Sequence, residues 1–491
     1  MKQIQKTAKL YLLVVGLAGL GLLVILYFGS HLPVPHLSLH ALSESQPTPL
    51  GVSSHATSLG LSVQHRLLDY AQDPLSRFFL QLFVVIVVSN LVGWIFTQCG
   101  QPSVVGEMIA GVLLGPSLFG LLAPETFAFV FGPSSLEPLR LLSQVGVCLF
   151  MFAVGMEMDW AELRQRASAA VLISHAGIAV PSLLAAGLAL VLYPRLAPPG
   201  APFVAFALFV AVSMSITAFP VLVRILQDHG IFATSLGRTA AACAAVGDVT
   251  AWGLLAFVVA VAKSSDFGSA AICLSLVLVF AAIMFGLVRP NLARWLGRAA
   301  VDSPIPSRGL LATVIALVLA SALCTQLLGI HALFGSFVAG MVMPRRGDFR
   351  GKLAVRIESI SSVFLLPIFF ASSGLRTEVG LLTGGIDWLI CAAIIVVATI
   401  GKLGGSVLAA RLVQVPWRES LQLGALMNTR GLMELIALNL GYELHILSQR
   451  LFSMLVLMAL ATTIMTGPLL ILFGQRRRIA ALSSAGAGSL E

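Results

Sequence analysis

The segment AACAAVGDVTAWGLLAF, residues 241–257, carries a single carboxylate, Asp248, in an otherwise uncharged stretch. The nearest charged neighbours are Arg238 and Lys263, so the stretch is long enough to cross the hydrocarbon core of a bilayer, which takes about 20 residues of helix. An ionisable group at membrane depth is costly and faces a bundle interior or an aqueous cavity, which makes it a functional-site candidate. The segment therefore predicts a transmembrane helix built around a functional carboxylate.

The composition of the whole chain predicts the same environment. Hydrophobic residues make up 58% of the 491 positions and charged residues 10%, against about 25% charged residues in a typical soluble domain. These values exclude a water-soluble fold and predict an all-α integral membrane protein in a lipid bilayer. The predicted spans are 8–29, 78–98, 102–122, 138–157, 168–194, 201–226, 235–262, 268–288, 309–329, 331–344, 357–375, 386–410, 420–442 and 451–474.

The distribution of basic residues orients these spans. With a cytoplasmic N-terminus, 21 of the 30 Lys and Arg residues fall in cytoplasmic segments and seven fall outside, as the positive-inside rule requires. Both termini are therefore predicted to be cytoplasmic, and the net charge of +9 is explained without a nucleic-acid partner. The two remaining basic residues, Lys402 and Arg430, lie at membrane depth.

Four regions follow from this topology. Residues 1–30 form an N-terminal transmembrane anchor, because the apolar stretch is longer than the apolar region of a usual cleaved signal peptide. Residues 31–75 form an extracytoplasmic loop, residues 76–475 the main transmembrane domain, and residues 476–491 a short cytoplasmic tail.

Other charges at membrane depth have less specific interpretations. Glu434 follows Arg430 by four positions, which suits an ion pair on one face of a helix. Glu107 lies nearer the end of a span. For Glu434 and Glu107, a structural role as a salt bridge or an interfacial anchor is at least as well supported as a functional role. For Asp248 the functional interpretation is favoured.

Two spans contain residues that break helices. SMSITAFPVLVRIL, residues 213–226, places Pro220 three residues after Thr217 in the middle of a span. LGALMNTRGLMELI, residues 423–436, interrupts an apolar run with Asn428, Thr429, Arg430 and Gly431. Freed backbone groups at this depth are tolerated only inside the protein or along a cavity.

Paired broken helices at matching positions in two halves of a chain indicate the ion site of a transporter. If spans two to seven and nine to fourteen are inverted repeats, the two breaks fall on the fifth helix of each repeat. Asp248 and Lys402 then lie on helices next to the broken ones. The alternative interpretation is a proline kink and an unrelated polar packing patch.

At these residues the chain resembles the monovalent cation:proton antiporter-2 superfamily, and most closely its cation/H⁺ exchanger branch. The resemblance covers about residues 78–474. It rests on VVGEMIAGVLLGPSLFG (104–120), SMSITAFPVLVRIL (213–226), the Asp248 helix, GIHALFGSFVAGMVMP (329–344), LLPIFFASSGLRTEV (365–379), the GK of ATIGKLGG (398–405) and MNTRGLMELIALNLGYELHILSQRLFSMLVLMALATTIMTGPLL (427–470).

The resemblance implies a 13-helix antiporter core of two inverted six-helix repeats with crossing discontinuous helices, plus one extra N-terminal transmembrane helix. It also implies a separate dimerisation domain and hence a homodimer. In such a protein Asp248 binds cation and proton alternately, Thr217 marks the first break, where cation-coordinating oxygens lie, and Lys402 faces the carboxylate. Arg430 occupies the second break, where members of the family differ.

Two features depart from the family. Asn, Gln or a second Asp usually precedes the critical Asp, and here that residue is Gly247, so the stoichiometry and the electrogenicity stay open. The sequence ends at Glu491 without the long regulatory tail of many relatives. We therefore expect no nucleotide-gated control, and we expect a bacterial inner membrane as the location.

The sequence thus predicts a secondary active transporter that exchanges Na⁺ or K⁺ for H⁺ by alternating access. It predicts no enzyme, no cofactor and no metal beyond the transported ion. The alternatives are a sodium-coupled organic-solute transporter of the same fold and a cation channel, although no filter-like motif is present. An intramembrane aspartyl protease needs two paired carboxylates, and no second mid-membrane Asp accompanies Asp248.

Overall fold

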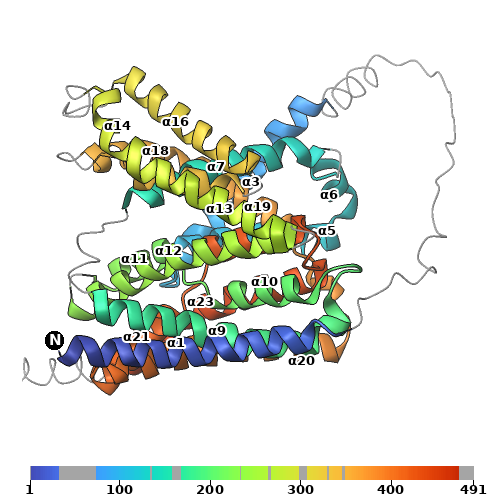
Figure 1. Cartoon of the computed structure of the whole chain (residues 1–491). Helices are drawn as coiled ribbons and strands as arrows, with labels where there is room; N and C mark the ends of the chain where they lie inside the picture. The colour runs from blue at the N-terminus through green and yellow to red at the C-terminus, as the bar shows by residue number, and fades with distance from the viewer. Residues whose placement is uncertain are drawn as a thin grey trace, which may run out of the picture.

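The computed structural model describes residues 2–32, 73–132, 135–157, 167–232, 234–263, 267–297, 307–328, 331–344 and 349–474, and all regular structure within these ranges is helical (Figure 1). In these ranges, 11 helices are long and apolar enough to cross a membrane, and two shorter apolar helices accompany them. The predicted all-helical membrane fold is confirmed. The number of crossings and the inverted repeat stay predictions.

Each predicted span overlaps a helix, and several spans contain more than one, including the three that follow. Span 201–226 comprises α10 (Phe203–Ser215) and α11 (Phe219–Asp228). Span 420–442 comprises α21 (Trp417–Met427) and α22 (Leu432–Glu443). Span 102–122 comprises α4 (Ser103–Leu114) and the short α5 (Phe119–Leu122). The predicted loop 31–75 and tail 476–491 lie almost entirely outside the described residues.

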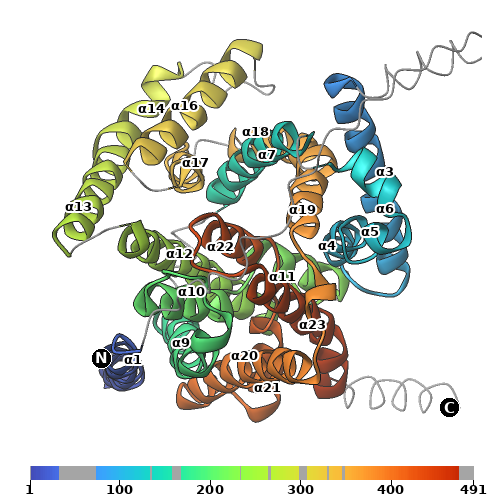
Figure 2. The same cartoon turned by 90° about the vertical axis from the view of Figure 1, so that its right-hand side faces the viewer.

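The helices form two bundles, which Figure 2 shows as separate groups. In the first, which we call the core bundle, α9 lies between α10 and α20, and α21 and α23 pack on α20. The core bundle consists of α9 (Ala167–Leu196), α10, α11, α12 (Ser235–Lys263), α20 (Gly385–Leu412), α21, α22 and α23 (Gln449–Gly474).

The second bundle is built on α7, which packs against α17 and α19. It consists of α3 (Pro74–Gln98), α4, α7 (Leu136–Glu157), α16 (Arg308–Leu327), α17 (Ala332–Met341), α18 (Phe349–Ile360) and α19 (Leu366–Leu375). Beyond α12, the chain leads through α13 (Phe267–Ile283), a π-helical turn and α14 (Arg289–Trp295) towards α16. The bundles meet where α22 contacts α19 and α23 contacts α4.

The N-terminal helix α1 (Lys2–Gly29) packs on α9 and α10, on the outside of the core bundle. The Tyr11 ring of α1 meets the His175 ring of α9 edge-on, with 5.4 Å between the centroids. Leu12, Leu13 and Leu17 are exposed, which suits a helix that faces lipid with most of its surface.

Close approach of α7 and α17 depends on glycine. A Cβ placed on Gly340 of α17 would lie 2.2 Å from the carbonyl oxygen of Phe152, and one on Gly155 of α7 would lie 2.2 Å from the carbonyl oxygen of Phe337. Small residues let membrane helices pack backbone to backbone, where van der Waals contact replaces the hydrophobic effect as the source of affinity.

We expect Gly340→Val to destabilise the second bundle by about 1–3 kcal/mol or more, because the side chain cannot fit without moving α7. Thermal unfolding followed by size-exclusion chromatography measures the effect. The matched control is Gly309→Val on α16, where a Cβ meets nothing within 4 Å. Equal stability of the two variants would contradict this packing.

Candidate functional site

The two broken helices contact each other at their breaks. Between α10 and α11 the backbone is extended at Ile216 and Ala218. The Thr217 hydroxyl donates to the Met427 carbonyl oxygen at 2.9 Å, and the Ala218 N–H donates to the Thr429 carbonyl oxygen at 3.1 Å. Two segments that are 210 residues apart therefore satisfy each other's backbone groups, as membrane depth requires.

Cationic side chains bind the end of α10. The Arg430 guanidinium donates to the carbonyl oxygens of Ser213 at 2.8 Å and Met214 at 2.6 Å, and the Lys402 ammonium donates to that of Ser215. The last carbonyls of a helix lack partners within it and carry partial negative charge. Arg430 and Lys402 supply both the missing donors and the opposite charge, and both side chains are almost fully buried.

The second break is also held by α23. The Arg430 N–H donates to the Thr463 hydroxyl at 2.9 Å, and the Thr429 and Thr466 hydroxyls lie 3.4 Å apart. Arg430 Nη1 and Glu434 Oε2 lie 3.5 Å apart and both side chains are fully buried. The predicted pair is therefore present, although Arg430 lies in the break before α22 rather than on the helix.

Asp248 lies beside this crossing and is fully buried in α12. The backbone amide of Phe219, the first residue of α11, and the Lys402 ammonium both interact with it electrostatically. Neither carboxylate oxygen has a hydrogen-bond partner among the described residues. The groups that face Asp248 are therefore the amide at the start of α11 and the ammonium of α20.

Further polar groups are buried without partners in the described part of the chain. They include the hydroxyls of Ser174 and Ser406 and both amide atoms of Asn428. A Cβ on Gly247 would meet the Ser174 hydroxyl at 3.0 Å, so the glycine before Asp248 lies against that oxygen. Groups of this kind can bind a dehydrated cation or ordered water.

Pro220 lies just after the first break and occupies the first turn of α11. Proline is tolerated at this position because the first N–H groups of a helix have no partner within it. Glu107 lies on α4 in the second bundle and takes no part in the crossing.

The sequence did not single out several residues that build the site. Thr463 and Thr466 come from ATTIMTGP, residues 461–468, where the repeated threonines in an apolar span were the available signal. His175 was also missed, and its Nε2 lies 3.1 Å from the Thr250 hydroxyl, two residues after Asp248. The carbonyls that bind Arg430 carry no signal in the sequence, because any residue has one.

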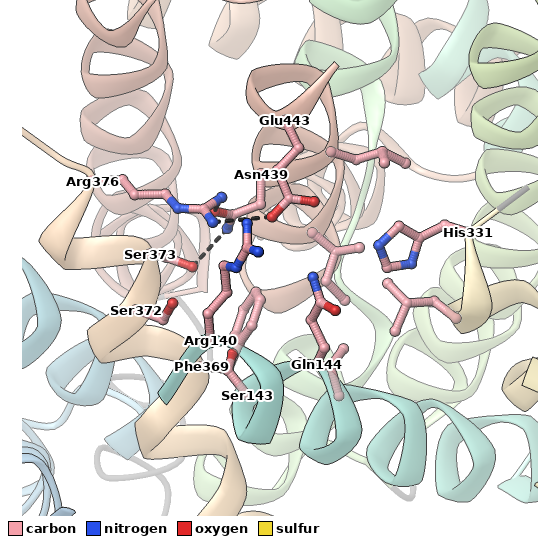
Figure 3. A pocket seen from close by; sticks show the side chains of 14 residues that line it. Arg140, Ser143, Gln144, His331, Phe369, Ser372, Ser373, Arg376, Asn439 and Glu443 are labelled. Carbon is pink, nitrogen blue, oxygen red and sulfur yellow. Dashed lines mark hydrogen bonds and ion pairs between the residues drawn. The ribbon is translucent and has the colours of Figure 1, made fainter. Parts of the chain in front are cut away.

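A pocket of about 420 Å³ lies between the bundles at the far end of α22 (Figure 3). The Arg376 guanidinium, just after α19, donates to Glu443 Oε1 at 3.0 Å and to Asn439 Oδ1 at 2.9 Å. Asn439 in turn donates to the Ser373 hydroxyl at 2.7 Å. These bonds, which we call the polar clasp, join the second bundle to the core bundle.

An aromatic contact joins the bundles nearer the crossing. Trp252, one turn after Asp248, packs against Phe334 and Phe337 of α17 with centroid distances of 5.2 and 5.9 Å. Beside it lies a small hollow lined by Ile216, Ala251, Trp252, Leu255 and Met433. These residues come from the break after α10, from α12 and from α22.

Comparisons with known proteins give a consistent result. The model of the family described as "Sodium/hydrogen exchanger, transmembrane" matches residues 84–473. The chain is 41% identical over 392 residues to the Na⁺/H⁺ antiporter NhaS4 of Synechocystis, covering 79% of this chain and 95% of that protein. It is 38% identical to cation/H⁺ antiporter 19 of Arabidopsis thaliana, covering 85% of this chain and 52% of that protein.

More distant similarities extend this result. The chain is 34% identical to K⁺/H⁺ antiporter 1 of Saccharomyces cerevisiae, covering 81% of this chain and 46% of that protein. It thus spans about half the length of these plant and yeast relatives. The fold is similar to that of the sodium proton antiporter MjNhaP1 from Methanocaldococcus jannaschii, with a TM-score of 0.55 and 14% identity over 80% of this chain and 96% of that one.

We expect Arg430→Met to cost about 3–5 kcal/mol of stability, because it leaves Glu434 without its partner and two α10 carbonyls without donors. The thermal unfolding midpoint of the detergent-solubilised protein measures the loss. Arg140→Met is the matched control, because the Arg140–Glu137 pair is 42% and 59% exposed and contributes at most about 1 kcal/mol. An Arg430→Met variant as stable as the control would refute the capping role.

Proposed function

Because the chain belongs to the sodium/hydrogen exchanger transmembrane family, we propose that it exchanges a monovalent cation, Na⁺ or K⁺, for protons across a membrane. The observation that carries the proposal is the state of Asp248. This carboxylate is fully buried beside two crossing helix breaks, and neither of its oxygens has a hydrogen-bond partner in the described residues. Glu434, the other buried carboxylate at the crossing, lies 3.5 Å from the Arg430 guanidinium, whereas Asp248 has no ion pair at that distance in the described residues. A group so placed can hold a proton or a dehydrated cation.

Exchange follows from exclusive occupancy of Asp248. A proton on the carboxylate removes the charge that a cation needs, and a bound cation disfavours protonation. The Thr217 hydroxyl donates its hydrogen bond to the Met427 carbonyl oxygen, which leaves the lone pairs of the hydroxyl oxygen available as a cation ligand. Lys402 stays beside the carboxylate through its bond to Ser215 and competes with the transported cation for the same negative charge.

Transport requires the core bundle to move against the second bundle. The Trp252 contact with α17 is aromatic and has no hydrogen-bond register, so it permits sliding. The polar clasp has defined donors and acceptors and must open if α22 moves away from α19. We assign the pocket beside the clasp to the extracytoplasmic side, because the predicted topology places Arg140 and Arg376 there.

The groups buried at the crossing favour an inorganic cation over an organic solute. They include the Asp248 carboxylate, the Thr217 hydroxyl and the Asn428 amide, whose oxygens suit a small cation. The hollow beside the α10 break is lined by Ile216, Ala251, Trp252, Leu255 and Met433, which offer an organic ion little polar contact.

We also propose a homodimer in a bacterial inner membrane, with both termini in the cytoplasm. The outer surface of the second bundle supports the dimer, because large apolar side chains of α3 and α5 are exposed there. They are Phe79, Phe83, Leu121 and Leu122. Basic residues concentrated in the predicted cytoplasmic segments support the orientation.

We expect proteoliposomes with wild-type protein to dissipate a pH gradient when Na⁺ or K⁺ is added, and Asp248→Asn to abolish this flux while the protein stays folded. Choline serves as the inert cation. Glu107→Gln is the matched control, since it neutralises an intramembrane carboxylate outside the crossing. Cation-independent proton flux, or full exchange in Asp248→Asn, would rule out the proposal.

Locking the polar clasp is expected to stop exchange. In a background without the six native cysteines, Arg376→Cys and Glu443→Cys are joined by a short reducible thiol crosslinker. Exchange should fall on crosslinking and return on reduction. A crosslinked protein that exchanges at the uncrosslinked rate would show that α19 and α22 do not separate during transport.

A further inference from the structure

A groove of about 920 Å³ runs along the outside of the core bundle between α1 and α20. Ala176 and Val180 of α9 form its floor, Leu10 and Val14 of α1 form one wall, and α20 forms the other. The groove exists because α1 packs on α9 and α10 but not extensively on α20. Figure 2 shows α1 and α20 next to α9, and both helices contact it.

The walls of the groove are apolar along most of its length. The α20 wall consists of Gly405, Leu408, Ala409 and Leu412, and Leu408 is 61% exposed. In a protein that spans a membrane, a hollow of this kind at the depth of the helices opens to hydrocarbon rather than to water. Its natural occupant is therefore an acyl chain.

One end of the groove is polar and basic. Arg411, in the last turn of α20, and Gln414 line this end. Lys9, which precedes the groove residue Leu10, is exposed on α1. The polar end formed by Arg411 and Gln414 is where a lipid headgroup would lie.

Two contacts place Arg411 at the depth of the headgroups. Its guanidinium lies 4.7 Å from the centre of the Trp417 ring, and Trp417 is 61% exposed, as tryptophans at the membrane–water boundary commonly are. The guanidinium also donates to the Val415 carbonyl oxygen, and its Nε is buried without a partner. No carboxylate in the described ranges pairs with Arg411, so the described part of the chain leaves its positive charge without an ion pair.

We propose that this groove binds an anionic phospholipid, with one acyl chain between α1 and α20 and the phosphate against Arg411. Guanidinium groups bind phosphate through two parallel hydrogen bonds, which makes arginine suited to this contact. The lipid fills the space that α1 leaves beside α20 and so attaches the N-terminal helix to the helix that carries Lys402. The proposal does not depend on the proposed cation exchange.

Native mass spectrometry of the full-length protein with equimolar phosphatidylglycerol and phosphatidylcholine of identical chains tests the site. We expect wild type to retain phosphatidylglycerol preferentially. Arg411→Gln should reduce that preference about tenfold, the value of one charge-assisted hydrogen bond, whereas Arg294→Gln on α14 should not. Arg411→Lys, which keeps the charge, should retain part of the preference.

A second variant tests the groove itself. Val14→Trp fills the space from the α1 wall and should reduce retention of both lipids, whereas Leu13→Trp, on the exposed face of the same helix, should leave retention unchanged. The proposal is overturned if Arg411→Gln keeps the wild-type preference for phosphatidylglycerol, or if Val14→Trp retains as much lipid as wild type. It is also overturned if Val14→Trp breaks a dimer, because the groove would then be occupied by a second copy of the chain.

Discussion

The rest of the structure depends on how two interrupted helices satisfy their backbone groups in the middle of a membrane. Lipid offers no hydrogen bonds, so each break must find its partners within the protein. The α10 carbonyls receive Arg430 and Lys402, and Thr217 and Ala218 bond to the second break. Each unsatisfied buried group costs about 1–3 kcal/mol, so this arrangement fixes how α10, α20 and α21–α22 pack.

This constraint separates the charges that hold the two breaks together from the carboxylate to which we assign the exchange. Arg430 is bound by two carbonyls and by Glu434, and it has little freedom to change partners. The Lys402 ammonium donates a hydrogen bond to the Ser215 carbonyl oxygen and is also attracted by the negative charge of Asp248. Asp248 faces the Phe219 amide and Lys402, and its oxygens have no hydrogen-bond partner among the described residues. The two breaks thus hold a frame around one carboxylate, to which our proposal assigns the transported ion.

Much of the fold and part of the site were predictable from local sequence. Apolar runs set the helices, and Pro220 and the Asn428–Gly431 segment marked the two interrupted spans. The ion pair of Arg430 with Glu434 followed from their spacing of four residues. Asp248 was identifiable because a carboxylate is rare in so long an apolar stretch.

What could not be predicted depends on tertiary contact. The carbonyl partners of Arg430 and Lys402 lie on α10, roughly 200 residues away in sequence, and backbone groups carry no sequence signal. The docking of α1 on α9 and the polar clasp between Arg376 and Glu443 likewise join segments that no local pattern relates. The crossing of the breaks was expected from the family resemblance, whereas its atomic partners required the structure.

The central claim is that one buried carboxylate holds either a proton or a cation. The most direct measurement is calorimetric titration of the purified protein with the transported cation in buffers of different ionisation enthalpy, which counts protons released on binding. At a pH where Asp248 is mainly protonated, the account predicts release of about one proton per bound cation, by linkage between the two occupants. Cation binding of normal affinity without proton release would contradict it.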